Sequence, residues 1–403
     1  MPGLAAVHWS EDGEARSAPW RSERGAAPPK KIVIADDRMK ADDAYGLACQ
    51  GVGLLWRGDF VNARQMLAAM GKRVDRPPPR PSPTGEGADQ KSPSPSCAQG
   101  VERGVGEGRG GGHAFNLYRQ SRAQRARVLG MLLVPLEADY SIPLRRAPDI
   151  RAACIEAYGP PGEVASVVAL RELLGIIGAH EWRTEGIEVP ALGDRVHPHY
   201  GVFAPVRGEY VDLVAQAPLP EALASSSIAF DIGTGTGVLA AVLAKRGVQR
   251  IVATDLDPRA LACARDNLAR LGLAKRVELV QADLFPEGRA ALVVCNPPWL
   301  PARPSSPLEH GIYDPESRML VAFLAGLPAH LEAGGEGWLI LSDLAEHLGL
   351  RSREALLAAF EASGLKVVDR LDARPKHPKA RDEADPLHHA RKAEVTSLWR
   401  LAA

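Results

Sequence analysis

The chain has 403 residues, which is enough for two or three domains of ordinary size. Its 49 basic and 49 acidic residues balance, so no overall field draws it to nucleic acid or to an anionic membrane. Five scattered cysteines without a Cys-x-x-Cys pair argue against a disulfide framework or a zinc site. No apolar run is long enough to span a membrane, and charges near the N-terminus argue against a signal peptide. These features favour a reducing cytoplasm.

The first half of the chain carries the pattern of a helical domain with a tail and an insert. Residues 1–35, with Ser, Glu and Pro clusters, predict a disordered tail, and residues 36–185 predict a helical N-terminal domain. Asp59 is expected to cap its second helix. Residues 71–112 are rich in Gly and Pro and lack aromatic residues, which predicts a low-complexity insert within this domain. Three helical stretches are expected after the insert, over 114–133, 148–158 and 164–182.

The second half of the chain has a different pattern. Branched and aromatic residues around Gly193 predict a β-hairpin connector over 186–206. From 207 to 403, short apolar runs alternate with helical patterns such as the helix that follows Asp257 and Pro258. This alternation predicts an α/β domain with a mostly parallel sheet, helices on both faces, and ligands at the carboxyl ends of the strands. The strand-like runs are SSIAFD, RIVATD, RVELVQAD, ALVVCN, EGWLILSD, KVVDRLDA and EVTSLWRL.

A glycine-rich turn follows the first of these strands, in the sequence DIGTGTG. Three glycines at alternate positions allow a tight turn whose backbone can touch a ligand. A dinucleotide fingerprint needs G-x-G-x-x-G, but Val238 follows the third glycine, so the turn favours a single nucleoside. A nicotinamide oxidoreductase is therefore a remote alternative. The predicted binding residues of this turn are Asp231, Gly233, Thr234, Gly235 and Gly237.

Polar residues also end the next three strands. Asp255 ends the second strand, about 20 residues after the turn, where a carboxylate can accept both hydroxyls of a ribose. Asp283 ends the third strand and is placed to meet an adenine amino group. The fourth strand ends in Asn296-Pro297-Pro298-Trp299, called NPPW below. An Asn-Pro pair also favours plain turns, so a purely structural turn is the alternative interpretation of NPPW.

Together these four strand ends resemble the class I S-adenosylmethionine-dependent methyltransferases of the N-P-P-aromatic branch. The resemblance covers about residues 199–401. It implies a Rossmann-like sheet of seven strands, mostly parallel with an antiparallel C-terminal strand, preceded here by the helical N-terminal domain. It also implies S-adenosylmethionine as the cofactor, bound by the glycine turn, Asp255, Asp283 and Asn296.

The N-P-P-aromatic branch methylates nitrogens conjugated to planar systems. Such a nitrogen is a poor nucleophile, so positioning supplies most of the catalysis. The Asn296 side-chain oxygen and the Pro297 carbonyl can accept its two N–H bonds and stabilise the developing charge. Trp299 offers a face for stacking. The catalytic residues implied are therefore Asn296, Pro297, Pro298 and Trp299.

The glutamine methyltransferases of this branch carry a Pro-Arg-Pro-Glu-Thr element, which FAPVRGEY (203–210) resembles in part. Arg207 and Glu209 are expected either to contact the methionine end of the cofactor or to cap the next helix. The first substrate expectation is a glutamine side chain in a protein, such as a translation factor. The alternatives are a nucleobase amino group in rRNA or tRNA (guanine N2 or adenine N6) and a non-catalytic cofactor-binding protein. No membrane partner is expected.

Three other features have ordinary explanations beside functional ones. An arginine strip can face RNA or form a solvated helix face, and it consists of Arg119, Arg122, Arg125 and Arg127. Residues 373–392 form either a substrate lip or an ordinary surface loop. No metal is assigned, because the histidines lack a ligand spacing with nearby acids; they are His197, His199, His388 and His389.

Overall fold

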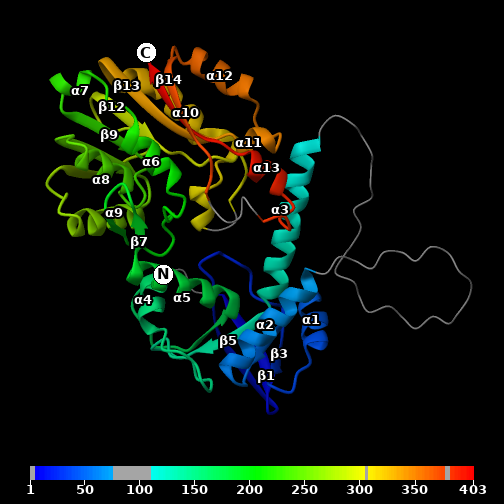
Figure 1. Cartoon of the computed structure of the whole chain (residues 1–403). Helices are drawn as coiled ribbons and strands as arrows, with labels where there is room; N and C mark the ends of the chain where they lie inside the picture. The colour runs from blue at the N-terminus through cyan, green and yellow to red at the C-terminus, as the bar shows by residue number, and fades with distance from the viewer. Residues whose placement is uncertain (1–4, 76–109, 305–306, 377–381) are drawn as a thin grey trace, which may run out of the picture. The chain divides into compact units, whose positions relative to one another are not determined.

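A computed structural model describes residues 5–75, 110–304, 307–376 and 382–403 of the chain (Figure 1). The chain divides into two compact units. The first comprises Met1–Gly108 and Arg119–Gly178, and the second comprises Arg109–Tyr118 and Ala179–Ala403. None of the helices in the described ranges is both long and apolar enough to cross a membrane.

The first unit is built on a six-stranded sheet in the order β1-β2-β6-β5-β4-β3. Its strands β3, β4 and β5 run parallel, whereas β6 is antiparallel to β5. The strands are β1 Ala6–Glu11, β2 Glu14–Arg21, β3 Lys31–Ala35, β4 Val52–Trp56, β5 Leu132–Leu136 and β6 Ser166–Ala169. The helices are α1 Ala41–Cys49, α2 Phe60–Val74, α3 Gly110–Leu129, α4 Arg151–Tyr158 and α5 Leu170–Glu185, with the ends of α3 and α5 in different units.

This sheet corrects two expectations about the first half of the chain. The region 1–35 is not a disordered tail over its described residues, because β1, β2 and β3 lie there. The region 36–185 is not purely helical, because β4, β5 and β6 join the same sheet. Every residue of β4 and β6 is buried, so these strands lack the alternation that marks a half-exposed strand. A short, fully buried strand cannot be distinguished from a helix segment by periodicity.

Several local predictions can also be compared with the first unit. Asp59 caps α2, with the Val61 backbone N–H donating to its Oδ1 at 2.9 Å, which confirms that prediction. The Gly/Pro-rich segment 71–112 is shorter than expected, since α2 continues to Val74 and α3 begins at Gly110. Its remaining residues, 76–109, lie outside the described residues.

The second unit begins with a hairpin and continues as a seven-stranded sheet. The hairpin strands, β7 Ile187–Val189 and β8 Asp194–Val196, pair antiparallel, and Gly193 between them has a φ of 61°. The sheet has the order β11-β10-β9-β12-β13-β15-β14, in which β15 alone of the described strands runs antiparallel to both neighbours. Its strands are β9 Ile228–Ile232, β10 Arg250–Asp255, β11 Val277–Gln281, β12 Ala290–Cys295, β13 Leu331–Ser342, β14 Lys366–Ala373 and β15 Thr396–Ala402.

Helices cover both faces of this sheet, which gives the expected three-layer α/β arrangement (Figure 1). Helices α6, α8 and α9 contribute to the core on one face, and α10 and α12 contribute to the other. Asp257 caps α9, and Gly272 follows its end with a φ of 71°, as the sequence predicts. The helices are α6 Glu209–Gln216, α7 Ala222–Ser225, α8 Val238–Lys245, α9 Pro258–Arg270, α10 Arg318–His330, α11 Leu344–His347, α12 Arg353–Ala362 and α13 His388–Ala393.

The strand order also locates the expected ligand site. From β9 the chain proceeds through β10 and β11 toward one edge of the sheet, then returns to place β12 and β13 on the other side of β9. Parallel α/β sheets bind ligands at the carboxyl ends of the strands where the order reverses in this way. In this unit the reversal lies between β9 and β12.

Candidate active site

The glycine turn after β9 has the backbone that the sequence predicts. Gly233, Gly235 and Gly237 have φ values of 71°, 55° and 81°, in a region that residues with side chains rarely adopt. A Cβ on Gly233 would lie 2.9 Å from the Met319 Cε, and one on Gly237 would lie 3.2 Å from the Ala264 backbone. Around the Cβ position of Gly235 nothing lies within 4 Å. The turn is therefore tight at both ends and open in the middle, as a backbone that receives a ligand must be.

Asp255, at the end of β10, holds the middle of this turn. Its Oδ2 accepts the Gly235 N–H at 3.0 Å, and its Oδ1 accepts the Asp257 N–H at 3.0 Å. The side chain is half-buried. Burial raises its pKa above the ordinary range, although the backbone hydrogen bonds oppose this shift. Asp283 lies beyond the end of β11 in an exposed bend.

Asp231, the last residue but one of β9, is buried beneath the turn. Its Oδ2 accepts from the Thr234 hydroxyl at 2.7 Å and from the Ala240 N–H at 3.0 Å. Its Oδ1 is buried and has no hydrogen-bond partner among the described residues. Burial raises the pKa of this carboxyl to about 6. An unpaired buried acceptor beside an open glycine turn fits a ligand with a hydrogen-bond donor, as the ammonium group of S-adenosylmethionine is.

The raised pKa of Asp231 predicts a specific pH dependence. In the folded state this carboxyl holds a proton up to about pH 6, whereas it ionises near pH 3.8 when unfolded. The free energy of unfolding therefore decreases as the pH rises between these values, by an amount on the order of 3 kcal/mol. We expect Asp231→Asn to flatten this part of the profile, measured by urea unfolding from pH 4 to 7.5. The exposed hairpin variant Asp194→Asn is the control, and an unchanged slope in Asp231→Asn would contradict the assignment.

NPPW begins directly after β12 and lies next to the glycine turn. Cys295 of β12 pairs with Ile232 of β9, so Asn296 and Gly233 leave adjacent strands at the same level. Asn296 is half-buried, and Pro297 is buried. The Trp299 indole N–H donates to the Asn296 Oδ1 at 2.8 Å. The structure therefore places the start of NPPW beside the turn after β9.

The segment after NPPW contributes residues to which the sequence analysis gave no role. The Asp314 N–H donates to the Leu300 carbonyl at 2.9 Å, and the Asp314 carboxylate accepts the Met319 N–H at 2.8 Å at the start of α10. Glu316 and Ser317 between them have φ values of 58° and 55°, which is strained for residues with side chains. This strained turn brings Met319 against Gly233. The Asp-Pro at 314–315 before an apolar helix is the signal that predicts such a helix start.

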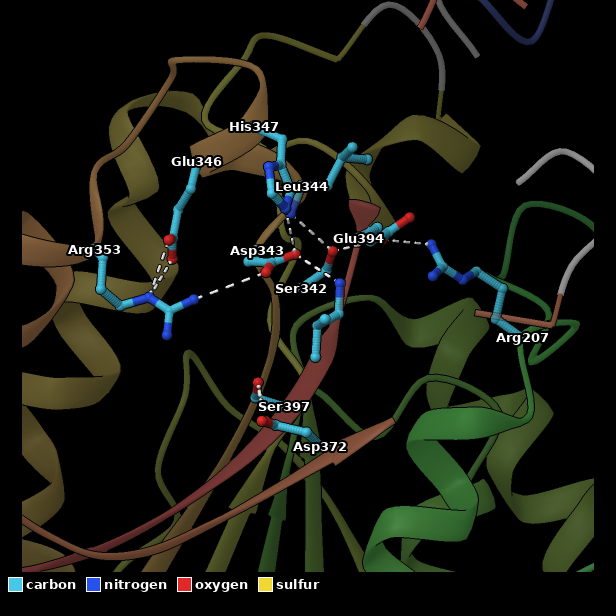
Figure 2. A network of polar contacts seen from close by, with 11 residues as sticks. Arg207, Ser342, Asp343, Leu344, Glu346, His347, Arg353, Asp372, Glu394 and Ser397 are labelled. Atoms are coloured by element: carbon cyan, nitrogen blue, oxygen red, sulfur yellow. Dashed lines mark hydrogen bonds and ion pairs between the residues drawn. The ribbon is translucent and has the colours of Figure 1, made fainter. Parts of the chain in front are cut away.

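Arg207 belongs to a second polar network, which it joins through Glu394 (Figure 2). Its Nε donates to Glu209 at 2.8 Å and its Nη1 donates to Glu394 at 3.0 Å. The Ser342 hydroxyl, at the end of β13, donates to the same Glu394 oxygen at 2.5 Å. The Arg207 guanidinium carbon lies 4.9 Å from the centroid of the Trp299 ring. Glu394 lies two residues before the start of β15, and no sequence pattern predicts a role for it.

The remaining candidates are the arginine strip, the expected substrate lip and a metal site. Arg125 pairs with Asp75 at 2.9 Å, and Arg127 donates to Gln124. Two of the four arginines of the strip therefore make contacts within the protein. Arg122 is exposed on the same helix. Of the expected lip 373–392, residues 377–381 lie outside the described residues. Within the described ranges, no group of three or more His, Cys, Asp or Glu side chains is arranged to hold a metal ion.

The reversed last strand separates this sheet from the all-parallel nucleotide-binding sheets and matches the class I S-adenosylmethionine-dependent methyltransferases. The family model of the methyltransferase small domain matches residues 195–363. The release factor glutamine methyltransferase of Cereibacter sphaeroides is 35% identical over 194 residues, which cover 42% of this chain and 67% of that protein. The chain belongs to this family of S-adenosylmethionine-dependent methyltransferases, and S-adenosylmethionine is its cofactor.

Other similar proteins overlap the chain less. The ribosomal protein L11 methyltransferase of Pelotomaculum thermopropionicum is 49% identical over 69 residues, so the chain spans only 22% of that protein's length. A solved S-adenosylmethionine-dependent methyltransferase from Geobacter sulfurreducens, in complex with S-adenosyl-L-homocysteine, has 17% identity and a TM-score of 0.34. It covers 50% of this chain and 91% of its own chain. These matches leave about half of the present chain without a counterpart.

Proposed function

We propose that this methyltransferase transfers a methyl group to a planar nitrogen in a protein, and that its acceptor is a glutamine side chain. The observation that carries the proposal is that the neighbouring strands β9 and β12 end side by side in the sheet. The Cys295 to Ile232 pairing sets Asn296 beside the glycine turn that begins at Gly233. An acceptor oxygen and a cofactor turn in this arrangement can aim a nitrogen at a methyl group.

Each predicted site residue has a proposed task in this arrangement. When bound, S-adenosylmethionine supplies the electrophilic methyl group. The turn from Asp231 to Gly237 binds its methionine end, Asp255 binds the ribose hydroxyls, and Asp283 binds the adenine amino group. The Asn296 Oδ1 and the Pro297 carbonyl accept the two N–H bonds of the substrate and stabilise the positive charge that develops on its nitrogen. Pro298 stiffens the turn between these acceptors and Trp299.

Two relatives support a protein substrate over a nucleic acid. They are named for the methylation of a release factor and of ribosomal protein L11. The neutral overall charge gives no net attraction to phosphates, and one arginine of the strip, Arg125, is paired with Asp75. A primary amide has two N–H donors, which matches the two acceptors at 296 and 297, and a nucleobase amino group matches them equally well. We rank a glutamine amide above a nucleobase amino group because the most extensively matched of these relatives is named for glutamine methylation.

The experiment that tests this proposal is methyl transfer from tritiated S-adenosylmethionine into purified release factor, ribosomal protein L11 and total RNA. We expect label in protein that resists ribonuclease and is removed by protease. Peptide mass spectrometry should then place the methyl group on a glutamine. Ribonuclease-sensitive label would overturn the protein assignment, and label on another side chain would overturn the glutamine assignment.

Salt dependence distinguishes the two substrate classes independently. A nucleic acid held through six or more phosphates should lose about 10³-fold or more in affinity between about 50 and 200 mM salt. We expect methylation of a protein acceptor to vary only a few-fold over this range. The double variant Arg122→Glu with Arg127→Glu, at two exposed positions of α3, should leave the rate mostly intact. A steep salt slope that these reversals abolish would identify an RNA substrate.

A further inference from the structure

Trp299, Asn296 and Arg207 form one continuous chain of contacts that the proposed tasks above do not use. The Trp299 indole occupies one acceptor position of Asn296, and the Arg207 guanidinium lies over the Trp299 ring. We propose that Arg207 is a positioning residue of the acceptor site: it holds the Trp299 ring in the plane in which its N–H fixes the orientation of the Asn296 amide. This inference rests on the proposed function, in which the Asn296 side-chain oxygen accepts a hydrogen bond from the substrate nitrogen.

Arg207 is held in place from two directions. Glu209, at the start of α6, accepts from its Nε. Glu394, before β15, accepts from its Nη1 (Figure 2). Both carboxylates are buried, with exposed fractions of 6% and 2%. Burial lowers the Arg207 pKa, but the charges of Glu394 and Glu209 outweigh this effect and raise the pKa above its ordinary value. The guanidinium therefore remains charged and has little freedom to leave the ring.

Glu394 in turn is fixed to the sheet. The Ser342 hydroxyl, at the carboxyl end of β13, donates to its carboxylate, and the Asp343 carboxylate accepts the Val395 N–H at 2.7 Å (Figure 2). The contacts thus run from the end of β13 and the start of β15 through Arg207 to the end of β12. A rigid sheet edge is the kind of support that a precisely placed acceptor requires.

The bond from Trp299 determines what Asn296 can accept. An amide oxygen has two lone pairs, and the indole N–H uses one of them. One acceptor position remains on Asn296 for a substrate N–H, and the Pro297 carbonyl offers a second. Without the indole N–H, the Asn296 amide can rotate and present its NH₂ group, which cannot accept a hydrogen bond. A phenylalanine ring at 299 would stack equally well but would lose this control.

The first measurement observes the contact chain directly, without a substrate. The chain has seven tryptophans, so the indole region of a ¹H–¹⁵N spectrum of the full-length protein contains few signals. Trp299→Phe identifies the Trp299 indole signal by its loss. We expect Asn296→Ala and Arg207→Met each to shift this signal and to speed its exchange with solvent. Arg353→Met is the matched control, because Arg353 pairs with Glu346 and lies 5.5 Å from the Trp399 ring, and should leave the Trp299 signal unchanged.

The second measurement is single-turnover methyl transfer at saturating cofactor. Losing a desolvated cation over an indole should slow the transfer step about tenfold in Arg207→Met, with cofactor affinity changed less than about twofold. Arg207→Lys retains a cation over the ring but cannot pair with both Glu209 and Glu394 in the same way, and it should recover part of the rate. Arg207→Met with Trp299→Phe should be no slower than Trp299→Phe alone, since both changes remove the same link.

Two results would overturn the positioning role. One is a Trp299 signal that is unchanged in Arg207→Met, and the other is additive rate losses in the double variant. If Arg207→Met does not fold, the same comparison is made with Arg207→Gln, which also removes the cation from the Trp299 ring, and an unchanged Trp299 signal in that variant would equally contradict the role. Failure of the proposed function is distinguishable, because absence of methyl transfer to every protein tested leaves the spectroscopic result in place.

Discussion

Replacing Asn296 with alanine is expected to slow methyl transfer by about 100- to 1000-fold, which is the typical effect of losing one hydrogen bond made in the transition state. Asn296 lies at the end of β12 beside Gly233 and does not hold the glycine turn itself. Cofactor affinity should therefore stay within a few-fold of the parent protein. Rapid-quench assays for the transfer step, with calorimetry for cofactor binding, measure the two effects separately.

The control for this prediction is Asn116→Ala, which makes the same change at an exposed position on α3 and should leave both quantities unaltered. Asn296→Asp provides a second comparison, because it retains an acceptor oxygen and the bond from Trp299. We expect it to keep more of the rate than the alanine variant. Near-full turnover in Asn296→Ala would show that NPPW is a structural turn.

The second large effect is expected at Asp255, whose replacement with alanine should lower cofactor affinity about 10- to 150-fold. Losing hydrogen bonds to a charged acceptor has an effect of roughly 1.5 to 3 kcal/mol, which corresponds to this range. The pKa of Asp255 is raised by burial, and only the ionised carboxylate can accept from both ribose hydroxyls. Cofactor affinity should therefore also fall as the pH decreases through this raised pKa, and calorimetry over a pH series measures both effects.

The structure adds a necessary control to the Asp255 experiment. This carboxylate also accepts the N–H groups of Gly235 and Asp257, so its removal loosens the turn itself. Asp255→Asn retains one acceptor oxygen and should give an intermediate affinity. Thermal melting of the free protein reports how much of the loss comes from the turn. Unchanged affinity in Asp255→Ala would overturn the cofactor geometry.

In the second unit, the order of motifs was sufficient to predict the fold. The glycine turn, Asp255, Asp283 and NPPW each follow an apolar run, and such strand ends meet at one edge of a parallel sheet. Capping signals were equally direct, since Asp257 and Gly272 bound α9 through local backbone geometry. These features depend on neighbours within a few residues, so sequence patterns describe them well.

In the first unit, the same reasoning was wrong about the strands. The sequence VGLLW of β4 is compatible with a buried helix or a buried strand, and only its pairing with β3 and β5 decides between them. The strands β1 and β2 were also missed, because they contain charged residues and only one buried residue each, so they lack a clear apolar alternation. Strand pairing is a long-range interaction that no window of sequence contains.

The sequence by itself predicted the class of enzyme, the glycine turn and NPPW, because the residues within each motif are adjacent in the chain. Only the tertiary structure decided which residues contact NPPW. Arg207 and Glu394 are 187 residues apart, and Trp299 belongs to a third segment, yet they meet at one sheet edge. Such contacts arise because β12, β13 and β15 are neighbours in the sheet, and this placement depends on pairing between strands that are far apart in the chain.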